Sequence, residues 1–373
     1  MKPLRIALVA AGLDGAAGGQ AIQAHLLVQR LREAGHHVVF LPIDPPFPRG
    51  LRWLKRVRFA RTLVNQALYI PSLRRLREVD SVHVFSASYG SFFLAPAPAI
   101  AAARLLRRRV VLNYHSGEAA DHLERDGFWL APWMRRVDAL VVPSRFLRRV
   151  FERHGYRALV IPNAVDLSAF DFPQRVHGGA RLLATRNLER IYGLDTVLQA
   201  VARLRERHPE VSLTLAGSGS QEGALRRLAA RLGVNVTFTG RVAPEKMPEL
   251  YRQADVLLNA SVVDNQPLSI LEAFASGLPV VTTATGDIAS LVSDGETGLL
   301  VPAGDPDRMA RAASRLLDDP LLAERLGRQA RARAAAHAWS AVCPLWEAVL
   351  RRAPEAPAGH PVELPRMAQR GRR

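Results

Sequence analysis

Short apolar runs alternate with amphipathic stretches along the first half of the chain. Residues 4–12 form an apolar run, residues 20–34 repeat apolar positions at helical spacing, and residues 36–43 form a second apolar run. Further runs follow at residues 81–88, 109–116, 139–144 and 159–165, with helical stretches between most of them. Strands that alternate with helices predict a parallel, doubly wound sheet.

The same pattern starts again in the second half. Strand candidates lie at residues 181–187, 211–217, 236–242, 255–261, 279–285 and 297–302. Helical stretches separate them at residues 194–207, 221–232, 248–254 and 267–276. The chain therefore predicts an α/β protein of two Rossmann-like domains, over residues 1–170 and 171–350. Residues 351–373, rich in Pro, Ala, Gly and Arg, predict a disordered basic tail.

Composition agrees with two domains that contain no membrane span. A chain of 373 residues is long for a single core. No stretch approaches about 18 uninterrupted apolar residues, so the sequence predicts no transmembrane helix. Cys343 is the only cysteine, which excludes an intrachain disulfide and favours a reducing, cytoplasmic location.

Charge is distributed unevenly between the two halves. The net charge is +17, and residues 1–165 carry 25 basic against 11 acidic residues, whereas residues 166–350 carry 20 against 21. No acidic residue lies between Asp44 and Glu78. The basic residues of that segment are Arg49, Arg52, Lys55, Arg56, Arg58, Arg61, Arg74, Arg75 and Arg77.

Residues 49–77 allow two interpretations. Apolar residues recur there at helical spacing beside the arginines, at Trp53, Val57, Ala60 and Val64. This pattern suits a helix that docks on an anionic membrane surface, at the inner face of the cell membrane. The alternative is a solvated helix whose apolar stripe packs on the sheet. A nucleic-acid partner is not favoured, because few aromatic residues interleave with the basic ones and no known motif occurs.

Residues that follow the predicted strands are the candidates for ligand binding, because ligands bind at the carboxyl ends of parallel strands. After the first strand a glycine-rich loop ends in Gly18 and Gly19, which allow close approach of a ligand to the backbone. Its spacing is not the dinucleotide fingerprint, which argues against an oxidoreductase. His115 follows residues 109–114, where it is either structural or able to donate to a sugar hydroxyl or accept a proton.

Candidates in the second half include two acidic residues in a mostly apolar segment. Asp264 precedes, and Glu272 lies within, a helix predicted to begin at Pro267 and to end at Gly277. A carboxylate packed there without a partner would cost several kcal/mol, so either an arginine or a ligand must complete its surroundings. The candidates at the ends of the neighbouring strands are Arg186, Gly217, Gly219, Gly240, Arg241 and Val242.

The motifs of the second half resemble the retaining nucleotide-sugar glycosyltransferases of glycosyltransferase family 4. The similar segments run from Arg186 through AGSGS, FTGRV and ADVLLNAS to DNQPLSILEAFASGLPVVTT and DGETGLLVPAGD. The first half agrees more loosely, through the glycine-rich loop, His115, VVPSRFLRRVFERHG and IPNAVD. The resemblance covers about residues 4–335 and implies the GT-B fold, in which two Rossmann-like domains face each other across a cleft.

The resemblance also implies roles for the candidates. Glu272 would accept hydrogen bonds from the nucleotide ribose, and Arg186 would neutralise the diphosphate as it leaves. Asp264 would hold the donor sugar, and His115 would reach that sugar from the opposite domain. The residues that would hold the donor phosphate are Asn265, Gln266, Pro267, Leu268 and Ser269. Gly240, Arg241 and Val242 would meet the base, in a donor site that also includes Gly18, Gly19, Gly217 and Gly219.

The resemblance implies no cofactor and no metal. The donor would be a nucleotide diphosphate-sugar, and the acceptor a hydroxyl group, with a lipid-linked sugar or cell-surface glycan precursor suggested by the basic region. Such an enzyme would serve polysaccharide biosynthesis. Asp305 and Asp307 flank Pro306 and predict a helix cap rather than a metal site.

Two residues depart from the family pattern. Asp264 stands where the family usually has glutamate, and Tyr192 stands where it usually has lysine, which leaves Arg190 as the candidate for a second positive charge. These departures keep two alternatives open. One is an epimerase or phosphorylase on the same fold, and the other is a non-catalytic protein that binds sugar nucleotides.

Overall fold

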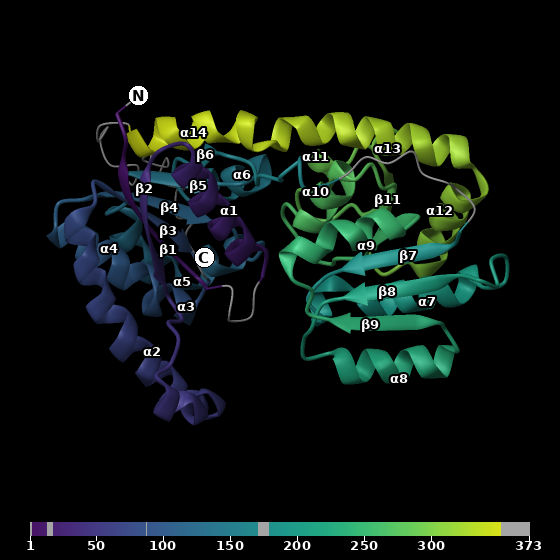
Figure 1. The fold of residues 1–373 in the computed structure, drawn as a ribbon, viewed down its shortest axis with the longest axis horizontal. Helices are drawn as coiled ribbons and strands as arrows, with labels where there is room; N and C mark the ends of the chain where they lie inside the picture. Colours follow the sequence, from purple (N-terminus) through teal and green to yellow (C-terminus); the bar gives the residue numbers. More distant parts are fainter. Residues whose placement is uncertain (1, 13–17, 87, 171–178, 352–373) are drawn as a thin grey trace, which may run out of the picture. The chain divides into compact units, whose positions relative to one another are not determined.

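The computed structural model describes residues 2–12, 18–86, 88–170 and 179–351 (Figure 1). The chain divides into two compact units, Met1–Ile161 with Leu345–Arg373, and Pro162–Pro344. Residues 352–373 of the predicted tail lie outside the described residues.

The first unit is built on a six-stranded parallel sheet of order β2-β1-β3-β4-β5-β6. The strands are β1 (Arg5–Ala10), β2 (His37–Pro42), β3 (Ser81–Ser86), β4 (Arg109–Tyr114), β5 (Ala139–Val142) and β6 (Leu159–Val160). The helices are α1 (Gly19–Glu33), α2 (Arg58–Ser72), α3 (Gly90–Leu94), α4 (Pro96–Leu105), α5 (Ala119–Met134) and α6 (Arg145–Arg153), with 3-10 turns η1 (Arg49–Arg56) and η2 (Leu73–Glu78).

The second unit repeats this plan with a parallel sheet of order β12-β11-β10-β7-β8-β9. Its strands are β7 (Arg181–Thr185), β8 (Ser212–Ala216), β9 (Val236–Gly240), β10 (Val256–Asn259), β11 (Val280–Thr283) and β12 (Leu299–Val301). Its helices are α7 (Leu194–Leu204), α8 (Glu222–Leu232), α9 (Met247–Gln253), α10 (Leu268–Ala275), α11 (Ile288–Leu291), α12 (Pro306–Asp318) and α13 (Pro320–Ala334). The 3-10 turns are η3 (Arg190–Tyr192), η4 (Pro244–Lys246) and η5 (Ala335–His337).

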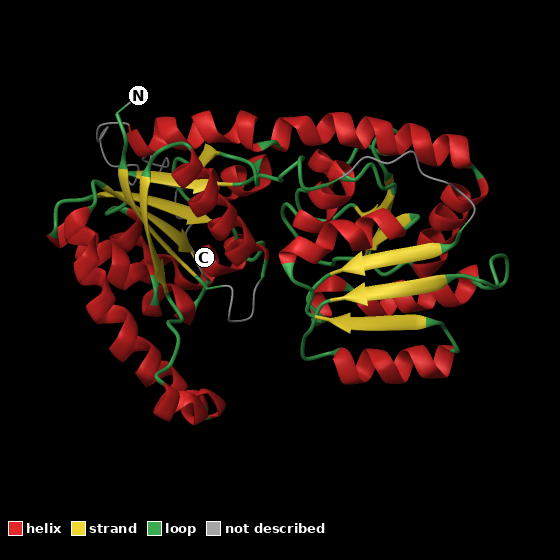
Figure 2. Ribbon diagram, in the orientation of Figure 1, coloured by secondary structure: helices red, strands yellow, loops and turns green. Residues whose placement is uncertain are grey.

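The prediction of parallel, doubly wound sheets is confirmed. Helices flank the strands in each unit (Figure 2). This arrangement buries the central strands on both faces, which explains why their sequences are continuous apolar runs rather than alternating ones. In β1, for example, Ile6, Ala7, Leu8 and Val9 are all inaccessible to solvent.

The last helix, α14 (Trp339–Arg351), belongs to both units. Its final part, from Leu345 onward, packs in the first unit. There the Trp346 ring lies 4.5 Å from the ring of His83, and Glu347 Oε1 lies 3.1 Å from His36 Nε2. His83 is fully buried, neither of its ring nitrogens has a hydrogen-bond partner within the described chain, and burial lowers its pKa to about 3.

Two further predictions can be compared with the structure. Asp305 caps α12 by accepting a hydrogen bond from the Arg308 N–H at 2.9 Å, with Pro306 as the first helical residue, so the predicted cap is confirmed. Asp307 forms an ion pair with Arg203. Within the described ranges, no helix combines the length and apolar character needed to cross a membrane.

Candidate functional site

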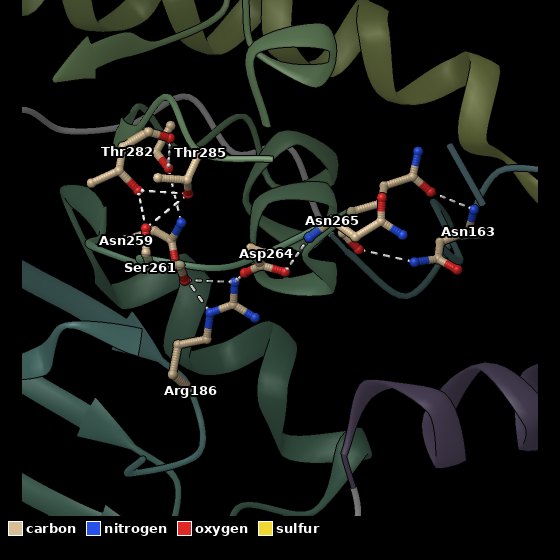
Figure 3. A network of polar contacts seen from close by, with 10 residues as sticks. Asn163, Arg186, Asn259, Ser261, Asp264, Asn265, Thr282 and Thr285 are labelled. Atoms are coloured by element: carbon tan, nitrogen blue, oxygen red, sulfur yellow. Dashed lines mark hydrogen bonds and ion pairs between the residues drawn. The ribbon is translucent and has the colours of Figure 1, made fainter. Parts of the chain in front are cut away.

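Arg186 lies directly after β7, with its side chain held by Asn259 at the end of β10 and by residues that follow this strand. Its Nε donates to Asn259 Oδ1 at 3.0 Å, and one terminal nitrogen donates to Ser261 Oγ at 3.1 Å (Figure 3). The same terminal nitrogen forms an ion pair with Asp264. These contacts fix the orientation of a guanidinium group whose side chain is only 13% exposed. Burial lowers the pKa of Arg186 from its usual value.

Asp264 is therefore completed by protein groups in this structure. One carboxylate oxygen pairs with Arg186, and the other accepts the Asn265 backbone N–H at 2.8 Å (Figure 3). The sequence left open whether an arginine or a ligand completes each carboxylate of this segment. At Asp264 the structure shows an arginine. A donor would thus meet Asp264 and Arg186 as a neutral pair rather than as separate charges.

Glu272 has different surroundings. The Tyr251 hydroxyl donates to Glu272 Oε2 at 2.7 Å, and Thr185 Oγ1 lies 2.7 Å from the same hydroxyl. Within the described chain no lysine or arginine forms an ion pair with Glu272. Burial raises the pKa of Glu272 to about 7, although the Tyr251 hydrogen bond and the Arg186 charge lower it. The described part of the chain thus leaves Glu272 without a paired cation.

Tyr192, which stands where the family usually has lysine, lies against Arg186. The Arg186 guanidinium carbon is 4.8 Å from the centre of the Tyr192 ring, in the geometry of a cation-π contact. Arg190, the candidate for a second positive charge, is exposed and makes no ion pair with any described residue. The structure thus gives Arg190 no fixed place in the site, whereas Tyr192 contacts the buried cation directly.

The loop after β8 requires glycine at two positions for steric reasons that the sequence did not reveal. Gly217 has a φ of +152°, and a Cβ there would lie 1.9 Å from the Arg186 carbonyl oxygen. A Cβ on Gly219 would lie 2.4 Å from the Leu188 carbonyl oxygen. The Gly217 N–H also donates to the Gly240 carbonyl at 2.9 Å, which links the loop after β8 to the end of β9. These glycines allow the loops to pack on one another.

The segment from Asn265 to Ser269 forms the N-terminus of α10. The helix begins at Leu268, one residue later than predicted, because Pro267 has the extended ψ of 126°. Gln266 is held by Asn163, whose backbone N–H donates to Gln266 Oε1 at 2.6 Å. The Ser269 hydroxyl is buried and has no hydrogen-bond partner among the described residues. A buried, unsatisfied donor at a helix N-terminus suits an anionic ligand.

Gly286 supports the Asp264 loop from the neighbouring strand connection. Its φ is +58°, and a Cβ there would lie 1.7 Å from the Asp264 carbonyl oxygen. Thr283 and Thr285 donate from the same region to the Ser261 carbonyl, at 2.6 Å and 2.8 Å. Thr285 and Ser261 are labelled in Figure 3. The loop that carries Asp264 is therefore packed on both backbone and hydroxyl groups.

The remaining predicted residues lie at other strand and helix ends. Arg241 is exposed and Val242 half-buried, both directly after β9. In the first unit, Gly18 is the N-cap of α1, and Gly19 is the first residue of that helix. His115 follows β4, its ring stacks on Phe85 at 5.2 Å, and burial lowers its pKa to about 4. The imidazole of His115 is thus neutral near pH 7.

Sequence reasoning missed the residues that hold the predicted ones in place. Thr185 and Tyr251 orient Glu272, while Asn259 and Ser261 orient Arg186. Thr185, Asn259 and Ser261 lie at strand ends, so the rule that identified Arg186 could have included them. Tyr251 is fully buried in α9, and its spacing resembles that of any core residue.

Comparisons with known proteins agree with this geometry. Residues 179–319 match the family model described as "Glycosyl transferases group 1". Residues 17–169 match the one described as "Glycosyltransferase Family 4".

Relatives match over nearly the whole chain. Glycogen synthase of Mycobacterium tuberculosis is 32% identical over 363 residues, covering 85% of this chain and 86% of the relative. Phosphatidyl-myo-inositol mannosyltransferase of Mycolicibacterium smegmatis is 28% identical over 368 residues, covering 91% of each. Among solved structures, Anabaena HepE in complex with UDP and glucose has a TM-score of 0.73 at 18% identity, covering 94% of this chain and 100% of that one.

Proposed function

This chain belongs to glycosyltransferase family 4 and has the GT-B fold, and on that premise we propose that it transfers a sugar from a nucleotide diphosphate-sugar to a hydroxyl acceptor, with retention of configuration. The observation that carries the proposal is the cluster at the carboxyl edge of the second sheet. Arg186, Asp264, Glu272 and the N-terminus of α10 converge there, and the Ser269 hydroxyl is buried without a hydrogen-bond partner in the described ranges. HepE was solved with UDP and glucose, which supports such a donor.

The diphosphate binds at the N-terminus of α10. Free helix N–H groups and the Ser269 hydroxyl donate to phosphate oxygens, in the manner of anion sites at other helix termini. Arg186 lies beside them, and its charge stabilises the negative charge that develops on the leaving diphosphate. Asp264 holds Arg186 until the donor arrives and then contacts the donor sugar.

Glu272 binds the ribose. Tyr251 occupies one of its oxygens, so the other remains to accept from a ribose hydroxyl. Only the ionised carboxylate accepts with both oxygens, so donor binding favours the form that burial disfavours. The loop from Gly240 to Val242 contacts the base, and no metal or cofactor is required.

The acceptor is a lipid-linked sugar or cell-surface glycan precursor, bound at the cytoplasmic face of the membrane. Residues 49–77 support this part of the proposal, because apolar side chains are exposed there among arginines. Trp53 is 64% exposed, Phe59 81% and Leu63 71%. The mannosyltransferase relative is named for a phosphatidylinositol acceptor, which also supports a lipid-borne substrate and a role in glycan biosynthesis.

Separate Asp264→Ala and Glu272→Ala variants test the donor site. Each should lose sugar transfer, and Glu272→Ala should also lose the thermal stabilisation that a nucleotide sugar confers, roughly 2.7 kcal/mol at 100 times its dissociation constant. Glu296→Ala, which removes an exposed carboxylate elsewhere in the second unit, is the control. Wild-type transfer by both site variants would show that these residues do not form the donor site.

Flotation with anionic liposomes tests the membrane part. Binding should be strong at low salt and should weaken at high salt, because arginine contacts to anionic lipid are screened. Absence of binding at both salt concentrations, or binding indifferent to salt, would contradict it.

A further inference from the structure

The outer side of α5 carries two large aromatic side chains that are exposed to solvent. Phe128 is 82% exposed and Trp129 is 65% exposed, and their rings meet edge to face with centres 5.2 Å apart. The opposite side of the helix packs in the core of the first unit, through the buried residues Ala119, Leu123, Leu130 and Met134. Adjacent exposed rings of this size are typical of an interaction surface rather than of scattered apolar residues.

The exposed residues of α5 and of its C-terminal end lie on one side of the helix. Five of them, at positions 121, 125, 128, 132 and 135, are separated by alternating steps of four and three residues. This is the spacing at which one helix packs along another. The whole surface, which we call the α5 face, consists of Asp121, Glu124, Arg125, Phe128, Trp129, Pro132, Arg135 and Arg136.

Charge is segregated along the α5 face. Asp121 and Glu124 lie toward the N-terminal end of the helix. Arg135 and Arg136 lie at its C-terminal end, and the aromatic pair lies between the two ends. Such a surface complements its own copy when two helices run antiparallel, because the acidic end of one then meets the basic end of the other. A parallel pair would instead place like charges together.

Glu124 and Arg135 are the two charges of this face that are open to a partner. Both are exposed, and neither forms an ion pair with any residue that the structure describes. They lie eleven positions apart, about 16 Å along the helix, and the midpoint between them falls beside Trp129. A two-fold axis at this midpoint places Glu124 of each copy opposite Arg135 of the other and brings the aromatic pairs together.

The other charges of the α5 face are held within the chain. Asp121 accepts a hydrogen bond from the Tyr89 hydroxyl at 2.5 Å, and Arg125 Nε lies 3.6 Å from Asp126 Oδ1. The Arg136 guanidinium donates to a backbone carbonyl one turn earlier at 2.7 Å. These side chains maintain the separation of charge, but they do not have to pair across a contact between copies.

We propose that the α5 face is the contact between two copies of this chain, which pair with their α5 helices antiparallel. Phe128 and Trp129 of one copy pack on the same two rings of the other. Glu124 of each copy pairs with Arg135 of the other, once at each end of the contact. The α5 face belongs to the first unit and the proposed donor site to the second, so the inference does not depend on glycosyl transfer.

An anionic membrane suits this face less well than a second copy does. A helix that docks on such a membrane carries basic residues along its polar side, as residues 49–77 do, where no acidic residue occurs. Anionic lipid would repel the acidic end of the α5 face, whereas the basic end of another α5 face matches it.

Sedimentation equilibrium of the full chain tests the contact. The wild type should associate to a dimer, and the double variant Phe128→Ser with Trp129→Ser should be monomeric, because its contact has lost the apolar surface. The matched control is Trp53→Ser with Phe59→Ser, which removes the same two residue types at 64% and 81% exposure from η1 and α2. The control should remain dimeric. Circular dichroism should be unchanged in both variants, because the replaced side chains are exposed.

Charge reversal tests the direction of the two helices. Glu124→Arg and Arg135→Glu should each weaken dimerisation at least about tenfold, because like charges then meet at both ends of the contact. An equimolar mixture of the two variants should regain wild-type affinity, because each end again pairs one acid with one base. Mixing would not rescue a merely structural effect of either substitution.

Several results would overturn the inference. These are a wild type that stays monomeric at every concentration, an aromatic variant as dimeric as the wild type, equal loss of dimer in the aromatic variant and its control, and a mixture of charge variants that does not regain affinity. Loss of flotation on phosphatidylglycerol vesicles in the aromatic variant, with its mass unchanged from wild type, would assign the α5 face to a membrane instead.

Discussion

Asp264 and Glu272 are both acidic residues of one short segment, yet their surroundings differ. Asp264 lies in a loop where Arg186 and a backbone N–H neutralise and hold it. Glu272 lies inside α10, where the Tyr251 hydroxyl is the one hydrogen-bond partner of its carboxylate among the described residues, and burial raises its pKa to about 7. The first carboxylate stabilises the unliganded fold, whereas the second weakens it when ionised. The difference indicates that Glu272 is the residue whose charge the ligand has to complete.

The largest effect is expected from removing Arg186, the cation that pairs with Asp264 and not with Glu272. Arg186→Ala should lower kcat by about 10²- to 10³-fold, the size of effect seen when one group that stabilises transition-state charge is lost. Arg252→Ala, at an exposed ion pair with Glu249 in α9, should leave kcat unchanged. Steady-state rates measure both, and wild-type turnover without Arg186 would exclude it from the chemistry.

Neutralising Asp264 should destabilise the protein. Asp264→Asn leaves the Arg186 guanidinium buried without its counter-charge, and breaking such a pair from one side costs roughly 3–5 kcal/mol. Urea unfolding measures the free energy of unfolding. In the double variant with Arg186→Met the two losses should not add, because the second change removes the stranded charge. Additive losses would mean that the pair contributes little.

Neutralising Glu272 should stabilise the protein, in contrast to neutralising Asp264. The folded protein holds the Glu272 proton more tightly than the unfolded chain does, so stability falls as the pH rises from about 4.5 to about 7. Glu272→Gln keeps an acceptor for Tyr251 and removes this loss, so it should be more stable than wild type by about 2 kcal/mol at pH 8. The gain should vanish near pH 4, and donor affinity should fall. A variant less stable than wild type at pH 8 would contradict this account.

The smallest effect is expected from Tyr251→Phe. In the wild type, the hydrogen bond from the Tyr251 hydroxyl lowers the pKa of Glu272. The variant lacks this bond, so the pKa of Glu272 should be higher in it. Donor affinity should weaken as the pH falls through about 7 in the wild type, and the midpoint should move upward by less than about one pH unit in the variant. Calorimetric titration with nucleotide sugar across this range measures it. A merely structural role would lower affinity equally at every pH.

The fold could be predicted because most buried strands are largely apolar and the helices between them repeat apolar positions at helical spacing. The site could be predicted only in part. Arg186 and Glu272 follow from position and resemblance, but the partners of Asp264 and Glu272 come from strands and helices distant in sequence. Tyr251 bonds to Glu272 across α9 and α10, and no spacing rule encodes that contact. For the same reason, the sequence could not distinguish arginine from ligand as the partner of Asp264.

The contacts of α14 have a practical consequence for dividing this protein. A fragment that ended at Ile161 would lack Trp346, whose ring contacts the ring of the buried His83, and Glu347, the partner of His36. The second unit, by contrast, is one uninterrupted stretch of chain. A chimera with a relative, made to change the acceptor, would therefore need two crossover points, one at each unit boundary. The C-terminal part of α14 would then come from the same protein as the rest of the first unit.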